Sequence, residues 1–307
     1  MNERQDPPLD VSFESGGEIC RAWHFLPLND AMAKYLRSPC IVMGHGFGGA
    51  RDAGLEPYAR RFAAAGFHVV VFDYRHFGAS DGEPRQLISI ENQLQDWAAA
   101  AAFAREIQGV DAARVALWGT SFSGGHVINA AFLDLRVAAV ISQCPFLDGG
   151  AILRAYLRYA GIRSGFRLLA AGIRDIIRSK LKRAPILLPI FGPPGSLAFL
   201  SSPDCEPGYA AIVPAGWRNE TPARIALAVA FYHPGKHLYD LTCPLLIQPC
   251  LRDVIAPPPV IDLARQRSRR RNITVITYDC GHFDLYQGEW FEKSAADQIA
   301  FLKMVIS

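Results

Sequence analysis

Short hydrophobic runs alternate with longer segments of helical periodicity along the first half of the chain. The runs are apolar almost throughout and lie at residues 40–43, 68–72, 114–118 and 137–142. Between them, residues 55–65 and 89–107 have the spacing and composition of helices. Uninterrupted apolar strands are typical of parallel sheets that helices cover on both faces. The pattern therefore predicts an α/β fold with a mostly parallel central sheet.

Both ends of the chain extend this predicted sheet. Residues 11–14 and 19–25 indicate an antiparallel hairpin that turns at Gly16 and Gly17. Near the other end, the strand pattern returns, and a final helical pattern follows it, at residues 244–250, 273–278 and 290–306. We expect all of these segments to belong to one core.

A long stretch without convincing strands interrupts the pattern after residue 142. It has apolar residues at helical spacing, broken by turn-forming sequences such as residues 192–195. We interpret residues 149–238 as a mostly helical cap inserted into the fold. The α/β core then consists of residues 1–148 and 239–307.

Composition narrows the class of protein. Half of the 307 residues are hydrophobic and only 20% are charged, which excludes a disordered chain. We expect part of this apolar surplus to line a pocket. The formal net charge of +3 is too small to indicate a nucleic-acid-binding protein.

Two groups of arginines invite other interpretations. The run Arg265, Arg267, Arg269, Arg270 and Arg271 suggests a phosphate-binding or targeting patch, but it follows a helix-like segment, and we favour a solvated helix end. The arginines of the predicted cap suggest a membrane surface, although a solvated outer face is the simpler interpretation. They are Arg158, Arg163, Arg167, Arg174 and Arg178.

Cysteine usage and the chain start bear on location and cofactors. The seven cysteines include no Cys-x-x-Cys pair, so neither a disulfide framework nor a zinc site is indicated. Residues 1–8 lack the apolar run of a secretory signal, and no window approaches the ~20 apolar residues of a membrane span. We expect a cytoplasmic protein without integral membrane association, metal or other cofactor.

The strongest chemical signal is a strand that enters a tight turn of small residues. Residues 114–125 read Arg-Val-Ala-Leu-Trp-Gly-Thr-Ser-Phe-Ser-Gly-Gly, with a helix predicted from about His126. This is the arrangement of a nucleophile elbow, which needs small residues two places before and after the serine. Gly119 and Ser123 fill those places around Ser121, although the second is usually glycine. We favour Ser121 as nucleophile because it lies between strand and helix, and Ser123 is the alternative.

A serine hydroxyl needs a neighbouring imidazole and a carboxylate to become a nucleophile. His282 follows the last predicted strand, and Asp253 follows the one before it. Open α/β sheets place their sites at the carboxyl ends of strands. We therefore predict Ser121 as nucleophile, His282 as base and Asp253 as the acid that orients it.

Other acids and histidines are weaker candidates. Asp148 follows the strand that ends at residue 142 and is the alternative acid. His76 and Asp73 lie in a strand-end loop, and they either line the site or only hold that loop. The remaining histidines lack such a setting, and the acids beside His282 are expected to serve loop structure. They are His24, His68, His126, His233 and His237, and Asp279 and Asp284.

Acyl chemistry also needs two donors for the developing oxyanion. Residues 44–49, Gly-His-Gly-Phe-Gly-Gly, follow a predicted strand where such a loop belongs, so we predict the amides of Phe47 and Phe122 as donors. A phosphate-binding loop is the rival, but neither Gly-x-Gly-x-x-Gly spacing nor a Walker lysine is present.

These residues resemble the α/β-hydrolase superfamily over essentially the whole chain. Four segments resemble a narrower group, which contains dienelactone-hydrolase-like proteins and microbial polyketide transferases and thiohydrolases. These segments are residues 72–82, 192–195, 217–219 and 223–224. The resemblance implies an α/β-hydrolase fold and the cleavage or transfer of acyl groups from esters or thioesters.

The function expected from these observations is hydrolysis of a medium-sized hydrophobic ester or thioester through an acyl-enzyme. An acyltransferase with an alcohol acceptor is the first alternative, and a noncatalytic ligand-binding protein of the same fold is the second. Carbon–carbon bond hydrolysis and perhydrolysis are more distant options. The acyl group, the acceptor and the oligomeric state stay open at this stage.

Overall fold

The computed structural model describes residues 7–257 and 272–307. The arginine run that begins at Arg265 lies outside these residues. Eight strands of the described chain form one sheet, in the order β1-β2-β4-β3-β5-β6-β9-β10. Their bounds are Leu9–Ser15, Glu18–Phe25, His68–Phe72, Ser38–Gly44, Val110–Thr120, Ala139–Gln143, Leu245–Gln248 and Ile273–Val275, in that order. From β4 to β10 the strands run parallel, and β1 and β2 add an antiparallel hairpin at one edge.

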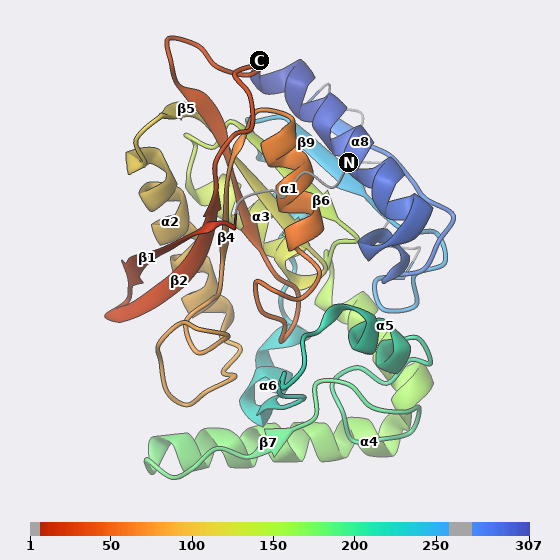
Figure 1. Ribbon diagram of the computed structural model, residues 1–307. Coiled ribbons are helices and arrows are strands. Elements are labelled where there is room, and N and C mark those ends of the chain that lie inside the picture. The colour runs from red at the N-terminus through yellow and green to blue at the C-terminus, as the bar shows by residue number, and fades with distance from the viewer. Residues whose placement is uncertain (1–6, 258–271) are drawn as a thin grey trace.

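Helices cover both faces of the sheet (Figure 1). Helices α1 (Glu56–Ala64) and α8 (Gly288–Ile306) pack on one face, and α2 (Ile90–Glu106) and α3 (Phe122–Leu133) pack on the other. In β3, Ile41 belongs to the first of these cores and Val42 to the second. Because both faces are buried, successive side chains of a strand are apolar. The predicted fold class is thereby confirmed.

Most predicted elements match the observed ones within a few residues. The hairpin turns at Gly16 and Gly17, whose φ angles of 58° and 85° suit glycine. Three predictions were wrong in extent. Strand β5 begins at Val110, four residues earlier than predicted. Helix α3 begins at Phe122 rather than near His126, and β10 ends at Val275, three residues earlier than predicted.

Between β6 and β9 the chain leaves the sheet and forms a mostly helical region below it (Figure 1). Its elements are α4 (Gly149–Lys180), β7 (Leu187–Leu188), α5 (Cys205–Ile212), β8 (Thr221–Pro222), η1 (Ala223–Ile225), α6 (Ala226–Val229) and η2 (Pro234–Tyr239). Asp148 starts α4 by accepting the amide of Ala151 at 2.7 Å. The buried carboxylate of Asp175 ties α4 to η1 through Arg224, at 2.7 Å.

No helix in the described ranges is both long and apolar enough to cross a membrane. All seven cysteines are buried and free.

Candidate active site

Ser121 lies in the sharp turn between β5 and α3. Its backbone has φ 56° and ψ −117°, a conformation that a residue with a Cβ adopts at a cost of about 1–3 kcal/mol. Two backbone hydrogen bonds hold the turn. The Ser121 amide donates to the carbonyl of Gln143, the last residue of β6, at 2.9 Å, and the amide of Phe146, three residues after β6, donates to the carbonyl of Ser121 at 2.8 Å. The neighbouring sheet strand therefore supports the strained residue.

Gly119 makes room for this turn. A Cβ atom at residue 119 would lie 2.1 Å from the carbonyl oxygen of Ser123, far inside contact distance. The first small position of the motif is thus required by the approach of the helix backbone.

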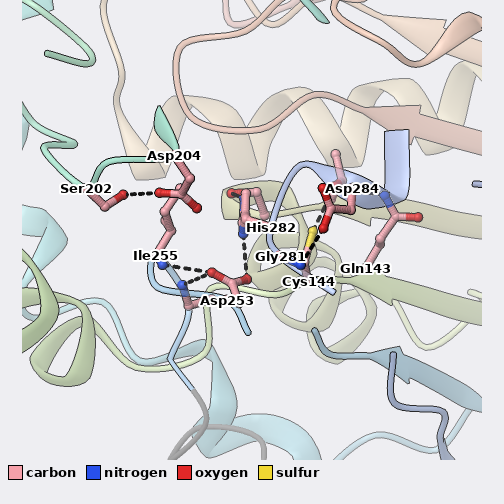
Figure 2. Close-up of polar contacts among 12 residues, drawn as sticks. Gln143, Cys144, Ser202, Asp204, Asp253, Ile255, Gly281, His282 and Asp284 are labelled. Atoms are coloured by element: carbon pink, nitrogen blue, oxygen red, sulfur yellow. Dashed lines mark hydrogen bonds and ion pairs between the residues drawn. The ribbon is translucent and has the colours of Figure 1, made fainter. Parts of the chain in front are cut away.

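The structure brings the three predicted site residues together. The Nε2 atom of His282 lies 3.0 Å from the Ser121 hydroxyl, and its Nδ1 atom lies 2.6 Å from Oδ2 of Asp253. The other oxygen of Asp253 accepts the amides of Ile255 and Ala256 at 2.8 and 2.7 Å. Figure 2 shows His282 and Asp253 directed at each other, with the amide of Ile255 behind the carboxylate. Because the carboxylate holds Nδ1, the imidazole presents Nε2 to the serine.

The electrostatics of this pair favour a strong base. Burial disfavours the charged imidazole and by itself would lower the pKa of His282. The negative charge of Asp253, followed by the charge of Cys144, the hydrogen bond to Asp253 and the charge of Asp204, outweighs burial and raises the pKa of His282 above the ordinary histidine value. The imidazole is therefore suited to accept a proton from a hydroxyl.

The predicted oxyanion loop lies against the serine. A Cβ atom built on Gly46 would lie 3.2 Å from the Ser121 Cβ, so the backbone before Phe47 passes close to it. The rings of Phe47 and Phe122 meet edge to face, with centroids 5.4 Å apart. Both residues line a cavity together with Ser121.

Two aromatic side chains from the region between β6 and β9 hold this loop. The Tyr209 hydroxyl donates to the carbonyl of Phe47 at 2.8 Å, and the indole of Trp217 donates to the carbonyl of Gly48 at 3.0 Å. Sequence reasoning missed both roles. Trp217 stands in a segment that carried the family resemblance, but nothing in its sequence pointed to the loop.

Ser123 has a different environment from Ser121. It is fully buried in the first turn of α3 and donates a hydrogen bond to the carbonyl of His45. Its oxygen also contacts the Tyr74 hydroxyl, which accepts from the indole of Trp97 at 2.7 Å. The Ser123 hydroxyl therefore holds the loop before Phe47 through these hydrogen bonds, and it is not directed at His282.

The other candidates form separate contacts. Asp148 caps α4 and lies 3.3 Å from His233. Asp73 accepts the amides of Arg51 and Ala79 and so holds its loop. The remaining contacts pair His24 with His68, His126 with Tyr232 and Gln93, His237 with Asp240, Asp279 with Arg252, and Asp284 with the Gly281 amide. His76 lies in the loop after β4, where the backbone amide of Gln86 donates a hydrogen bond to the His76 carbonyl.

Comparison with known proteins identifies the family of this chain. The model of the Alpha/beta hydrolase family matches residues 41–294. The chain belongs to this family. The match begins in β3 and ends in α8, so it includes the elbow, the loop before it and both partners of Ser121.

Three proteins similar to this alpha/beta hydrolase differ in how much of the chain they match. The quorum-quenching protein AidA of Acinetobacter baumannii is 40% identical and covers 100% of this chain and 98% of its own. The thiohydrolase aneE of Aspergillus aculeatus is 39% identical over 110 residues, which are 36% of this chain and 35% of its own. The crystal structure of the alpha/beta hydrolase GrgF from Penicillium has a TM-score of 0.80 at 24% identity, with 98% and 99% of the two chains covered. The last comparison shows the shared fold.

In this alpha/beta hydrolase, two hollows of different character flank the Ser121–His282 contact. Ser121 opens into a cavity of about 80 Å³ with an almost entirely apolar lining that includes Phe146, Ile152 and Phe199. His282 also borders a hollow of about 510 Å³ that includes the polar side chains of Asp204 and Asp284. The site can therefore hold an apolar group on one side and a polar group on the other.

Proposed function

We propose that this protein is a serine hydrolase that cleaves an ester or thioester of a medium-sized hydrophobic acyl group. Ser121 is the nucleophile, His282 the base and Asp253 the acid that orients the base. The observation that carries the proposal is the hydrogen-bonded series from Asp253 through His282 to Ser121, which ends at an apolar cavity.

In the first step, Oγ of Ser121 attacks the carbonyl carbon while its proton passes to Nε2 of His282. The carbonyl π electrons move to oxygen, and the amides of Phe47 and Phe122 donate hydrogen bonds to this oxyanion. When the carbonyl re-forms, the bond to the alcohol or thiol breaks, and His282 returns its proton to that leaving group. The acyl group is then bound as an ester of Ser121.

In the second step, water attacks the acyl-enzyme. His282 accepts a proton from the water as the new carbon–oxygen bond forms, and Ser121 regains a proton from His282 when it leaves. The products are the free acid and the regenerated serine.

The shape and polarity of the two hollows support this choice of substrate. An apolar lining beside Ser121 favours an aliphatic or aromatic acyl group. We infer that this group binds between a cap of residues 149–238 and the core of residues 1–148 and 239–307. Two relatives are named thiohydrolases, which supports thioesters as well as esters.

One observation favours an acyltransferase as the second candidate function. The hollow beside His282 is large enough for an alcohol, which could replace water in the second step. The relative grgF of Penicillium, 36% identical over 143 residues, is named a polyketide transferase. Product analysis with added alcohols separates the two: an ester product identifies transfer, and free acid alone identifies hydrolysis.

The seven buried, free cysteines suit a reducing compartment. We therefore infer that the protein acts in the cytoplasm.

The decisive experiment combines turnover with covalent labelling. Wild-type protein should hydrolyse p-nitrophenyl butyrate and react with a fluorophosphonate probe, whereas Ser121→Ala should do neither and remain folded by circular dichroism. Ser123→Ala is the matched control, and it should still be labelled. Labelling of Ser121→Ala but not of Ser123→Ala would assign the nucleophile to Ser123 and overturn the proposal. A wild-type protein that neither turns over esters nor takes the probe would favour a noncatalytic ligand-binding role.

A further inference from the structure

An apolar groove lies on the outer part of the region between β6 and β9. It has a volume of about 380 Å³ and runs between α4 and α6. Some of its side chains are unusually exposed for their size, with Ile162, Phe166 and Phe231 at 65%, 67% and 80%. Exposed apolar surface of this kind is typical of a binding site for an apolar ligand or partner. The hydrolase chemistry at Ser121 does not by itself account for it.

The groove shares a wall with the cavity beside Ser121. Both hollows are lined by Leu153, Tyr156, Leu168, Ala226 and Ala230. Tyr156 and Leu168 are buried, with 9% of each side chain exposed. An apolar chain that enters at Ser121 and passes this wall therefore reaches the groove.

The sizes of the hollows show why a chain would need both. Pockets for small molecules usually measure about 300–1,000 Å³. The cavity beside Ser121, at about 80 Å³, is far smaller than this range, whereas the groove lies within it. A short acyl group fits the cavity alone, and a longer one must continue elsewhere.

The chemistry of the groove restricts what it accepts. Its lining consists of aliphatic and aromatic side chains and one glycine, and no charged side chain contributes to it. A charged or strongly hydrated group would lose its water there without compensation. A hydrocarbon chain has no such cost, because transfer of its apolar surface out of water is favourable.

We propose that this groove binds the distal part of a long aliphatic acyl chain whose carbonyl lies at Ser121. The proposal rests on the proposed function of Ser121 and adds the substrate class, namely long-chain acyl esters or thioesters with an uncharged, apolar end. Full burial of each methylene should raise kcat/KM roughly fourfold. Selectivity for long over short acyl groups is therefore the property that the groove controls.

The test compares two neighbouring positions on the same helix. Leu169 lines the groove and is 45% exposed, whereas Ile173, one turn further along α4, is 47% exposed and does not line it. Leu169→Asp and Ile173→Asp place the same charge at equally exposed helix positions. The readout is the ratio of kcat/KM for p-nitrophenyl laurate to that for p-nitrophenyl butyrate, with laurate kept below its micelle-forming concentration.

We expect Leu169→Asp to lower this ratio at least about tenfold, which corresponds to losing the burial of two methylenes. Ile173→Asp should keep the wild-type ratio, and thermal unfolding should show that both variants are folded. Equal ratios in wild type and both variants would overturn the proposal. An equal fall in both variants, with a change in oligomeric state by light scattering, would also overturn it and identify the face as an interface between copies of the chain.

Failure of the underlying function gives a different result. If Ser121 is not the nucleophile, Ser121→Ala retains turnover of butyrate, whatever the chain-length ratio. If only the groove assignment fails, Ser121→Ala is inactive and the ratio is insensitive to Leu169→Asp.

Discussion

The Nδ1 atom of His282 lies 2.6 Å from Oδ2 of Asp253, and both side chains are almost fully buried. This contact fixes the imidazole tautomer and stabilises its protonated form. Asp253→Asn keeps the shape but replaces an acceptor oxygen by an amide. In serine enzymes of this type such a change costs roughly 10⁴-fold in kcat, and we expect a loss of that order.

The loss is measured as steady-state hydrolysis of p-nitrophenyl butyrate. Asp279→Asn is the control, because that carboxylate is exposed and lies 3.3 Å from Arg252 rather than near the imidazole. It should change kcat less than about threefold. Near wild-type activity in Asp253→Asn would exclude Asp253 as the orienting acid.

The pH dependence of the reaction follows from the raised pKa of His282. His282 accepts a proton only when neutral, so kcat/KM should increase with pH, by up to about tenfold per pH unit below the pKa. Because the pKa is raised, this ascending limb should lie above pH 6.5, the ordinary histidine value. Removing the carboxylate in Asp253→Asn should move the limb to lower pH. A profile that falls between pH 6 and pH 8 would contradict this assignment.

Gly119→Ala tests the packing of the elbow. The added Cβ would lie 2.1 Å from a backbone carbonyl, which cannot rotate away as a side chain does. We expect a loss of about 1–3 kcal/mol in the free energy of unfolding and a larger proportional loss of activity, because Ser121 would shift. Urea unfolding followed by tryptophan fluorescence measures the free energy of unfolding.

Gly150→Ala is the matched control for this substitution. Its Cβ would lie 3.2 Å from the Asp148 carboxylate, a side-chain atom that can move. Its stability should change by less than about 1 kcal/mol. Similar losses in both variants would show that the elbow has no special requirement for glycine.

Tyr209→Phe tests the support of the oxyanion loop. The substitution removes the 2.8 Å hydrogen bond to the Phe47 carbonyl and leaves that oxygen without its donor. A hydrogen bond of this kind contributes about 1 kcal/mol, so we expect kcat to fall about fivefold while KM changes little. Tyr35→Phe, at a side chain that is 99% exposed, should have no effect. A change confined to KM would place Tyr209 in substrate binding instead.

The sheet and the three site residues could be predicted because their signals are local. Strands such as β3 are buried on both faces, which leaves a continuous apolar run in the sequence. Ser121, Asp253 and His282 each follow such a run, and parallel strands bring their carboxyl ends to one edge. The elbow was recognisable because only small residues fit at position 119.

The supports of the site could not be predicted from local patterns. Tyr209 is 162 residues away from the carbonyl that it holds, and no periodicity links the two. The early start of α3 was missed because residues 123–125, Ser-Gly-Gly, have low helix propensity, which the burial of this first turn in the fold overrides. The strand β10 was overestimated because its regular pairing with β9 ends at Val275. Beyond it, only single backbone hydrogen bonds, from Ile276 to Ile247 and from Tyr278 to Pro249, and an isolated bridge between Tyr278 and Cys250 continue the line of the strand.

The series of contacts from Trp97 through Tyr74 and Ser123 to His45 joins the far side of the elbow to the loop that carries Phe47. Ser123, at the second small position of the motif, therefore supplies a hydroxyl that holds this loop, which a glycine could not do. A substitution at Trp97 in α2 would therefore act through this connection on the loop that carries Phe47, the proposed oxyanion donor. Engineering of the rate could accordingly begin at Trp97 in α2, which does not line the cavity beside Ser121.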